Sequence, residues 1–509
     1  MTVLVLGDQL CREVGPVARR PDERVVMIEA TEFGRRLPYH PHKLTLVFSA
    51  MRHFRDALRA DGRPVEYRQV ERFADGFDEH FDAHPGDDLV AMRPVGDGAA
   101  RRLRNLVGER GGTLEFVRDE RFLSDPATFD EIAGEPPFRH EGFYRAMRRR
   151  TGYLMTDGEP LGGEWNYDDE NRDTPPADYD PPDPPRFEPD GITQNVQEWV
   201  DDEFLASEEV GWPQTGAWAD PEPFAWPVTR EEALTALADF VTHRLPDFGP
   251  YQDAMVADEP TMNHALLSPA LNLGLLRPSE VIERAIAAGG NDAVPINSLE
   301  GFVRQVLGWR EFVRHVYRRT MPDLASANQL GADRDLPDAY WTGDTGMRCL
   351  HDAVEGVRRR GYAHHIERLM VLSNFALLYG VDPAQLNEWF HAGFVDAFHW
   401  VTTPNVIEMG SFGAGVFASK PYAASANYVD RMSDFCGDCR YDHRETTGDD
   451  ACPFNALYWD FLDRNEDRLR PNGRMALVYS HLDDKDEDEL AAIRERAREV
   501  RRRGREGEL

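Results

Sequence analysis

The sequence predicts a mixed fold, with an N-terminal α/β domain on a doubly wound parallel sheet followed by a large all-helical domain. Short apolar runs alternate with helical patterns near the N-terminus, whereas helical periodicity dominates from about residue 225. A proline-rich acidic segment separates the two regions. We expect an α/β domain over residues 1–125, a connector with a helical part over 126–224 and a helical domain over 225–509.

Five runs in the first domain predict buried strands. Each is short, rich in aliphatic residues and bounded by turn residues, as strands of a parallel sheet covered on both faces are. They cover residues 2–10, 24–30, 64–70, 87–95 and 113–119, with helix-period segments at 42–61 and 98–110.

The first of these runs also predicts a ligand position. Ligands of doubly wound sheets lie beyond the carboxyl ends of the strands, which points to Asp8 and Gln9. No GxGxxG motif follows the run, so an ordinary dinucleotide site is not expected.

The rest of the chain is a connector followed by helices. Residues 171–190 hold seven prolines among acidic residues and cannot form a packed element. Beyond residue 225, stretches such as "GFVRQVLGWREFVRHVYRR" carry apolar residues at three- and four-residue spacing. Residues 488–509 have little apolar surface and predict a solvated helix or a frayed tail.

The charge is strongly acidic and nearly free of lysine. Net charge is -33, and only three of the 58 basic residues are lysine: Lys43, Lys420 and Lys485. This composition predicts adaptation to a salty, halophilic cytoplasm, in which counterion release drives DNA binding weakly. A nucleic-acid partner is therefore not excluded. With five cysteines, no signal peptide and no apolar run of about 18–20 residues, we expect a cytoplasmic protein without membrane contact.

Four of the five cysteines suggest a metal centre. Cys436, Cys439 and Cys452 lie close in sequence, and Cys349 lies upstream. Four thiolates suit tetrahedral zinc or a 4Fe-4S cluster, and a final cysteine followed by proline recurs at iron–sulfur ligands. Spacing alone leaves zinc, iron–sulfur and free thiols open. Cys11, near the first strand, is expected to be a small core residue.

Several motifs occur in a characteristic order. They are "LGDQL" (6–10), "AMRHF" (50–54), "GFYRAMRRRTGYLM" (142–155), "GGEWNYDDENR" (162–172), "HALLSPALNLGLL" (264–276), "GWREF" (308–312), "YAHHIERLM" (362–370) and "PNVIEM" (404–409). With the four cysteines, they resemble the photolyase/cryptochrome superfamily, in particular its iron–sulfur branch of bacterial and archaeal cryptochromes and (6-4) photolyases. The resemblance runs from residue 2 to about 460 and favours a 4Fe-4S cluster.

The resemblance implies that the helical domain binds FAD. The family's TSxLSP motif reads "HALLSP" here, so its first two hydroxyl residues are missing and only the last serine matches. This serine stands at a helix start, where free N–H groups can hold a phosphate. Each expected contact could equally be a helix cap or a core polar pair. The expected contacts are Tyr251, Ser268, Arg310, the Arg368–Asp396 charge pair and Asn405.

The resemblance also implies a pocket for a flipped DNA lesion, lined by Gln305, Trp309 and Met409. Read alone, Trp309 fits a core position better. Reversing a (6-4) product benefits from a proton donor, and imidazole suits that task. His364 and His365 diverge by about 100° on a helix, so only one can face a ligand squarely. The resemblance favours His365.

Electron transfer, antenna and DNA contacts follow from the same resemblance. Trp341 and Trp389 match the electron path, but Phe390 replaces a tyrosine, so Trp400 is an alternative stepping stone. An antenna, 6,7-dimethyl-8-ribityllumazine, would contact Asp8, Gln9, Glu29 and Tyr39. DNA phosphates would meet Arg145, Arg148, Arg149 and Arg150, which could instead pair with the "DDENR" segment.

The sequence therefore predicts a monomeric, light-driven (6-4) photolyase that acts on UV-damaged DNA. One alternative is a blue-light photoreceptor of the cryptochrome type, signalling through flavin redox state without repair. Another is an iron–sulfur flavoprotein that binds nucleic acid without light chemistry.

Overall fold

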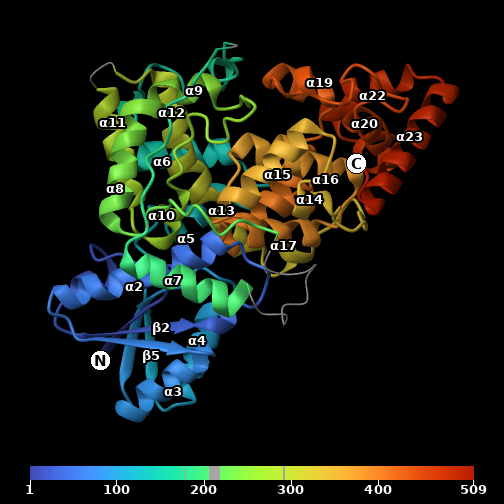
Figure 1. Ribbon diagram of the computed structural model, residues 1–509. Coiled ribbons are helices and arrows are strands. Elements are labelled where there is room, and N and C mark those ends of the chain that lie inside the picture. Colours follow the sequence, from blue (N-terminus) through green and yellow to red (C-terminus); the bar gives the residue numbers. More distant parts are fainter. Residues whose placement is uncertain (177, 206–217, 291–292) are drawn as a thin grey trace.

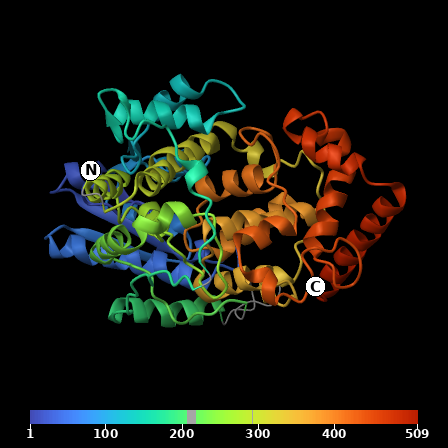
Figure 2. The same ribbon diagram turned by 90° about the horizontal axis from the view of Figure 1, so that it is seen from above.

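The computed structural model describes residues 1–176, 178–205, 218–290 and 293–509. An α/β unit lies at one end of the molecule and helices form the rest (Figure 1). Viewed from above, the C-terminal helices lie at the opposite end from the N-terminus (Figure 2). The predicted combination of an α/β and an all-helical part is confirmed.

The sheet of the α/β unit has five parallel strands in the order β3-β2-β1-β4-β5. Each predicted run contains one strand, although the first strand stops at Val5, well before the end of its apolar run. The strands are β1 (Thr2–Val5), β2 (Arg24–Ala30), β3 (Val65–Val70), β4 (Asp88–Met92) and β5 (Thr113–Val117).

Helices cover both faces of this sheet, because alternate strand residues point to opposite sides. Val3 and Val5 pack in one core with α2 (Pro41–Ala60) and α7 (Gly191–Val200). Leu4 packs in another core with α3 (Phe73–Ala83) and α4 (Ala99–Gly108). The doubly wound arrangement is therefore confirmed.

The first part of the connector carries the helices α5 (Pro126–Ala133) and α6 (His140–Thr151), and α7 follows later in it. The described residues of the segment 171–190 form no helix or strand, as its prolines predict. α6 packs against a π-helical turn of the helical part, η5 (Arg304–Trp309).

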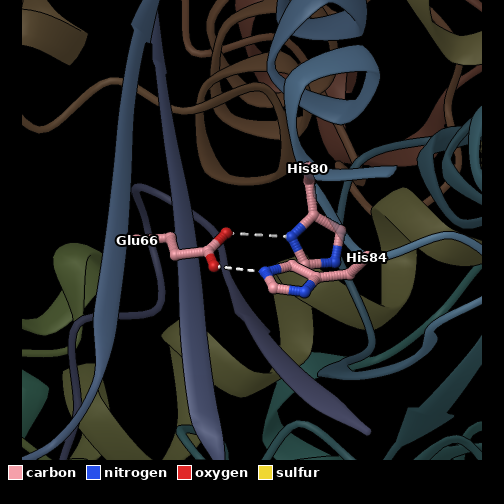
Figure 3. Close-up of side chains that lie close together, drawn as sticks. All are labelled: Glu66, His80 and His84. Carbon is pink, nitrogen blue, oxygen red and sulfur yellow. Dashed lines mark hydrogen bonds and ion pairs between the residues drawn. The ribbon is translucent and has the colours of Figure 1, made fainter. Parts of the chain in front are cut away.

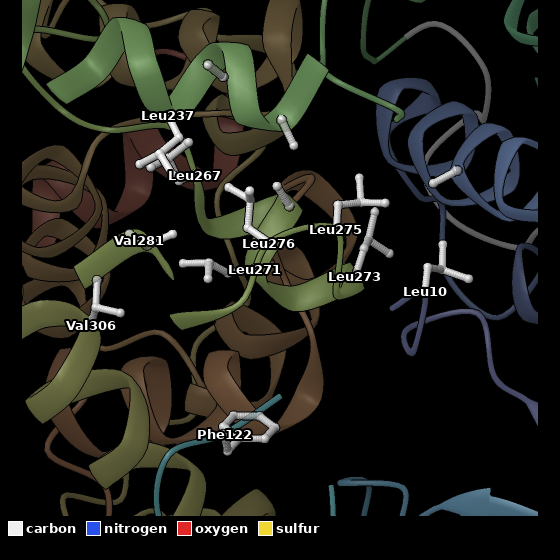
Figure 4. Packing of buried hydrophobic residues seen from close by; sticks show 14 of the residues in the cluster. Leu10, Phe122, Leu237, Leu267, Leu271, Leu273, Leu275, Leu276, Val281 and Val306 are labelled. Carbon is white, nitrogen blue, oxygen red and sulfur yellow. The ribbon is translucent and has the colours of Figure 1, made fainter. Parts of the chain in front are cut away.

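One hydrophobic core joins the α/β unit to the first helices of the helical part. The Leu10 N–H donates to the Leu273 carbonyl at 2.8 Å, and the two side chains lie together in this core (Figure 4). The same core includes residues of α8 (Arg230–Asp239), α10 (Ser268–Leu273) and α11 (Pro278–Gly289). The two parts thus fold against each other, and the boundaries at 125 and 224 stay a prediction.

A second core holds the C-terminal helices. It is built from α15 (Arg348–Arg360), η7 (Glu367–Ser373), α16 (Asn374–Tyr379), α17 (Pro383–Gly393), η8 (Pro404–Gly410), α20 (Pro453–Arg464) and α23 (Glu487–Glu506). Among the described residues, none of the helices combines the length and hydropathy needed to cross a bilayer.

The prediction of a solvated or frayed C-terminus is wrong for α23. Ile493, Ala497 and Val500 form a narrow buried stripe at four- and three-residue spacing and pack with α20. Buried Arg501 donates to the Tyr379 carbonyl at 3.0 Å, so even basic side chains of this helix serve packing. Cys11 is a core residue, as expected, with 1% exposure.

Candidate functional site

A cavity of about 310 Å³ opens in the helical part. Three π-helical turns, η5, η7 and η8, contribute lining residues. The start of α10 and the loop after α17 supply further lining residues. π-Helical turns inside helices are frequent at functional sites. A mainly apolar cavity with a few convergent polar groups is typical of a small-molecule site.

The polar side of the cavity is organised around Asp396. Its carboxylate accepts from the Ser268 hydroxyl at 2.6 Å and from the Arg368 guanidinium at 3.0 Å. Burial raises the pKa of this carboxyl, but the Arg368 charge and the Ser268 hydroxyl outweigh it and hold the pKa below its usual range. The structure therefore brings three predicted FAD contacts into one network.

Arg310 lines the same cavity from the start of α13 (Arg310–Thr320). Its guanidinium lies 4.2 Å from the Phe122 ring centroid and 5.2 Å from that of Trp400. Burial lowers its pKa to about 10. Within the described residues its Nε has no hydrogen-bond partner. A buried cation with an unused donor is suited to an anionic group of a ligand.

Trp309, Gln305 and Met409 also line the cavity, as the sequence predicts. The Trp309 indole N–H donates to Asn405 Oδ1 at 3.0 Å, and the Asn405 amide donates to the Val401 carbonyl at 2.7 Å. Asn405 is therefore held in place between two elements. Gln305 is exposed on η5.

The two neighbouring histidines point in different directions. His365 lines the cavity and is exposed within it, whereas His364 is 1% exposed and does not line it. The His364 ring stacks on His264 with centroids 4.7 Å apart. The surrounding protein and the Arg368 charge lower the pKa of His365 to about 4. His365 can therefore contact a ligand directly, and His364 supports the wall behind it.

Tyr251 lies outside the group that lines the cavity. It ends α9 (Leu245–Tyr251), and its ring centroid is 4.7 Å from that of Tyr179 in the connector. Phe248, one turn earlier, lines the cavity instead.

A row of aromatic side chains leads from the cavity into the second core. Phe390 and Phe394 line the cavity and stack at 4.9 Å. Trp389 meets Phe390 edge-on at 5.2 Å and Tyr340 at 5.0 Å. Trp341 follows Tyr340 in the sequence and packs edge-on against Trp218 at 5.1 Å. Trp400 lies on the Arg310 side.

The four predicted antenna residues have separate environments. The Glu29 carboxylate is buried and accepts from Arg52 and Gln69, each at 2.8 Å, and from Tyr67. Gln9 donates to the Met92 carbonyl at 3.1 Å, and Asp8 lies 3.6 Å from Arg121. Tyr39 lines a distinct cavity of about 20 Å³ with Pro38 and Trp218. Their role as antenna contacts stays a prediction.

Four thiols converge on one small space, as the sequence predicts. Cys349 on α15, Cys436 in η9 (Phe435–Asp438), Cys439 and Cys452 all line a cavity of about 10 Å³, and none forms a disulfide. Burial raises the pKa of Cys452 to about 12, and the neighbouring cysteines add to the shift. Without a ligand these groups are therefore neutral thiols near pH 7, and four cysteines that line one space are a donor set that can hold a metal ion or cluster once they lose their protons.

The arginines of α6 divide between structural and free positions. Arg148 is buried and donates to the Trp165 carbonyl at 3.0 Å, and Arg145 pairs with Glu141 at 2.6 Å. Arg149 and Arg150 are exposed, with Arg149 lying 4.5 Å from the Trp165 ring centroid. Only the latter two offer a charge to a partner without breaking a structural contact.

Sequence reasoning missed two residues that shape the cavity wall. Lys43 on α2 is 7% exposed and donates to the carbonyls of His391 at 2.5 Å and Ala397 at 2.7 Å, on either side of Asp396. Glu408 is fully buried and accepts four backbone N–H groups, from Ala414, Gly415, Phe417 and Ala418. The scarcity of lysine was the one signal for Lys43, and the signal for Glu408 was its place in the "PNVIEM" motif.

The fold is similar to two solved structures. A bacterial class III photolyase from Agrobacterium tumefaciens aligns with a TM-score of 0.60 and 17% identity, over 97% of this chain and 91% of that chain. A Synechocystis sp. PCC6803 cryptochrome aligns with a TM-score of 0.59 and 15% identity, over 85% of this chain and 86% of that chain. The sheet and the helical part therefore share the fold of these photolyase and cryptochrome structures.

Sequence comparison gives the family. Residues 3–215 match the family described as deoxyribodipyrimidine photo-lyase-related protein. The chain is 40% identical over 488 residues to the (6-4) photolyase of Agrobacterium fabrum (strain C58 / ATCC 33970), covering 94% of each chain. Two uncharacterized proteins of Acanthamoeba polyphaga mimivirus are 30% identical over 112 and 109 residues. The chain belongs to the photolyase-related family.

Proposed function

We propose that this chain is a light-driven (6-4) photolyase, which repairs pyrimidine–pyrimidone (6-4) photoproducts in UV-damaged DNA by electron transfer from reduced FAD. The observation that carries the proposal is the 40% identity to a (6-4) photolyase across 94% of both chains. The cavity supports it, because aromatic, amide and imidazole side chains of the predicted types line one space.

FAD is proposed to occupy the cavity, where it supplies a light-excitable electron donor. Ser268, Arg310, Arg368 and Asp396 are the polar residues proposed to hold it. The Arg368–Asp396 pair fixes the orientation of both side chains, and Arg310 brings a buried positive charge to the cavity lining, which favours an anionic part of the ligand. The proposed role of Tyr251 is weaker, because that residue lies outside the cavity lining.

The lesion is proposed to enter beside Trp309, Gln305 and Met409. Trp309 offers a flat face for stacking a flipped base, worth about 1–3 kcal/mol. His365 is proposed to supply a proton to the group that moves during (6-4) reversal. Its pKa of about 4 keeps the ring neutral before a ligand binds, so the proton must be gained once an anionic ligand lies beside it.

Electrons are proposed to reach the cavity through Trp341, Trp389 and Phe390. Edge contacts of 5.0–5.2 Å around Trp389 support this route. Phe390 lacks the hydroxyl that a tyrosine would use to form a neutral radical, so it would act as a bridge between Trp389 and the cavity. Trp400, beside Arg310, is the proposed alternative.

The four cysteines are proposed to bind a 4Fe-4S cluster. Thiols from three separate segments line one space, and four thiolates are the donor set that such a cluster needs. The lumazine antenna is also proposed, with Asp8, Gln9, Glu29 and Tyr39 as its contacts, although the cavity beside Tyr39, about 20 Å³, is only large enough for about one water molecule.

DNA is proposed to contact Arg149 and Arg150 on α6, which packs on η5 beside the cavity. Arginine side chains at exposed positions anchor phosphates. We propose a monomer acting in the cytoplasm of a halophilic cell, where the net charge of -33 is screened.

Lesion turnover tests the proposal. Photoreduced protein is mixed, without oxygen and in high salt, with an oligonucleotide carrying one (6-4) photoproduct, and chromatography follows blue light or darkness. Light-dependent return of the intact dipyrimidine is expected. Complete photoreduction without repair of that lesion or of a cyclobutane dimer would instead support the photoreceptor alternative.

A further inference from the structure

A second set of side chains with metal-binding chemistry lies apart from the cavity and the cysteines, in the α/β unit. Glu66 on β3, His80 near the end of α3 and His84 directly after α3 point toward one another (Figure 3). One oxygen or nitrogen atom from each lies within 4.8 Å of the others. β3 is an edge strand, so this cluster lies at the border of the sheet.

The fold brings these three residues together for simple reasons. His80 and His84 are four residues apart and therefore share one face of the chain at the end of α3. α3 follows β3 and packs back against it, so this face meets the strand. The sequence signal is the spacing "HFDAH" at 80–84 after a strand that carries a carboxylate.

The Glu66 carboxylate is shared by four partners. His80 Nδ1 lies 3.1 Å from Oε2, and His84 Nε2 lies 2.6 Å from Oε1. Arg24 lies 3.2 Å from Oε1 and Arg68 lies 3.0 Å from Oε2. Each oxygen thus has one histidine and one arginine partner.

The two nitrogens of the fully buried His80 ring face two carboxylates. Its Nδ1 lies 3.1 Å from Glu66 Oε2, and its Nε2 lies 3.3 Å from Asp87 Oδ2. Within the described residues Nε2 has no hydrogen-bond partner. A buried polar atom without a partner is costly. A cation on Nδ1 would place the ring N–H on Nε2, where it faces Asp87.

This arrangement matches the surroundings of a metal ligand. A histidine that binds a metal through one nitrogen almost always donates its other N–H to a carboxylate, carbonyl or water, and ligating carboxylates accept further hydrogen bonds. Asp87 Oδ2, 3.3 Å from His80 Nε2, is placed for the first role. Arg24 and Arg68 have the second role for Glu66, and their partial exposure, 36% and 26%, lets water screen their charges.

We propose that Glu66, His80 and His84 bind a zinc ion, with water as the fourth ligand. Two imidazoles and one carboxylate are an established type of zinc donor set. The ion would join β3 to the end of α3 and stabilise the edge of the sheet by mass action. It is independent of the proposed repair activity.

Zinc binding by the purified full-length protein, with its four-cysteine site as isolated, tests this proposal. Zinc sulfate is titrated in a calorimeter, and zinc K-edge X-ray absorption identifies the ligands. We expect one ion per chain with only nitrogen and oxygen ligands. Glu66→Gln and His84→Gln should each weaken binding by more than about 100-fold, and Asp87→Asn by about 10–100-fold.

His481→Gln is the matched control, since His481 is an exposed histidine in the last turn of α22 (Ala476–Asp483). It should bind zinc like the unchanged protein. Because His80 is buried, the variants avoid it, and circular dichroism verifies that each variant is folded. Zinc bound only through sulfur, or equal zinc affinity in the unchanged protein and His84→Gln, would overturn the proposal.

Discussion

At the scale of single residues, the cavity depends on how Asp396 is bound. Its carboxylate joins Ser268 at the start of α10 to Arg368 in η7, two segments about a hundred residues apart in sequence. No periodicity predicts such a contact, because each partner lies in its own element. The resemblance to photolyases predicted the Arg368–Asp396 pair. The structure shows that the Ser268 hydroxyl also donates to the Asp396 carboxylate.

Asp396→Asn should destabilise the protein by roughly 3 kcal/mol, because it leaves the Arg368 charge without its carboxylate partner. Thermal unfolding measures this loss. Asp483→Asn is the control, since Asp483 pairs with Arg470 where both side chains are exposed, and it should destabilise the protein far less than Asp396→Asn does. Similar losses in both variants would contradict the assigned importance of Asp396.

The stacked histidines predict a pH dependence of stability. Burial lowers the pKa of His264 to about 3, with smaller contributions from His365 and Arg368. Between pH 6.5 and about 3 the unfolded chain therefore binds more protons, so the free energy of unfolding falls as pH is lowered. His264 alone should contribute about 2 kcal/mol between pH 7 and 5.

Urea unfolding at pH 7, 6 and 5 measures that slope. His264→Phe keeps an aromatic ring against His364 but cannot be protonated, so its slope should be shallower. Equal slopes in the two proteins would mean that His264 does not titrate as described.

At the scale of elements, Lys43 ties α2 to the loop that carries Asp396. Its amine donates to two carbonyls, which a neutral amine can also do. Burial lowers the pKa of Lys43 to about 7. Between about pH 7 and 10.5, Lys43 carries a proton in the unfolded chain but not in the folded protein. The free energy of unfolding should therefore rise by about 2 kcal/mol between pH 7 and 9.

Lys43→Met should remove this rise, whereas Lys420→Met, which changes an exposed lysine, should keep it. Urea unfolding at pH 7, 8 and 9 compares the three proteins. If the free energy of unfolding rises equally with pH in Lys43→Met and in the unchanged protein, the Lys43 amine does not lose its proton in the folded state.

Strands and helices were predictable because their hydrophobic periods differ, and the five strands of the parallel sheet fall in the predicted runs. The π-helical turns η5, η7 and η8 were not, because one extra residue in a turn leaves no clear period in the sequence. α23 was misjudged because Ile493, Ala497 and Val500 are few, yet their spacing makes a continuous stripe.

At the scale of the whole molecule, the two parts share one core, and the cavity wall depends on both. Leu10 packs with Leu273, and Lys43 holds carbonyls beside Asp396. In the sequence, the proline-rich segment separates two patterns of periodicity, and the domain boundaries drawn from it stay a prediction. The contacts that join the two parts link residues far apart in sequence, so no local pattern predicts them.

The charge of -33 predicts that salt stabilises the protein. Repulsion among carboxylates disfavours the compact state, and the screening length falls from about 10 Å at 0.1 M salt to about 3 Å at 1 M. The melting temperature, followed by circular dichroism, should therefore rise steadily from 0.1 to 2 M KCl. A melting temperature that stays constant or falls would contradict adaptation to salt.

The most direct test of the central claim compares the unchanged protein with His365→Ala in single-turnover repair of a (6-4) photoproduct under blue light. We expect light-dependent repair by the unchanged protein and a repair rate lower by roughly 100-fold or more in the variant, with equal flavin photoreduction in both. Full photoreduction without repair by the unchanged protein would contradict the assignment as a (6-4) photolyase. Equal repair by the variant would contradict the role of His365 as proton donor.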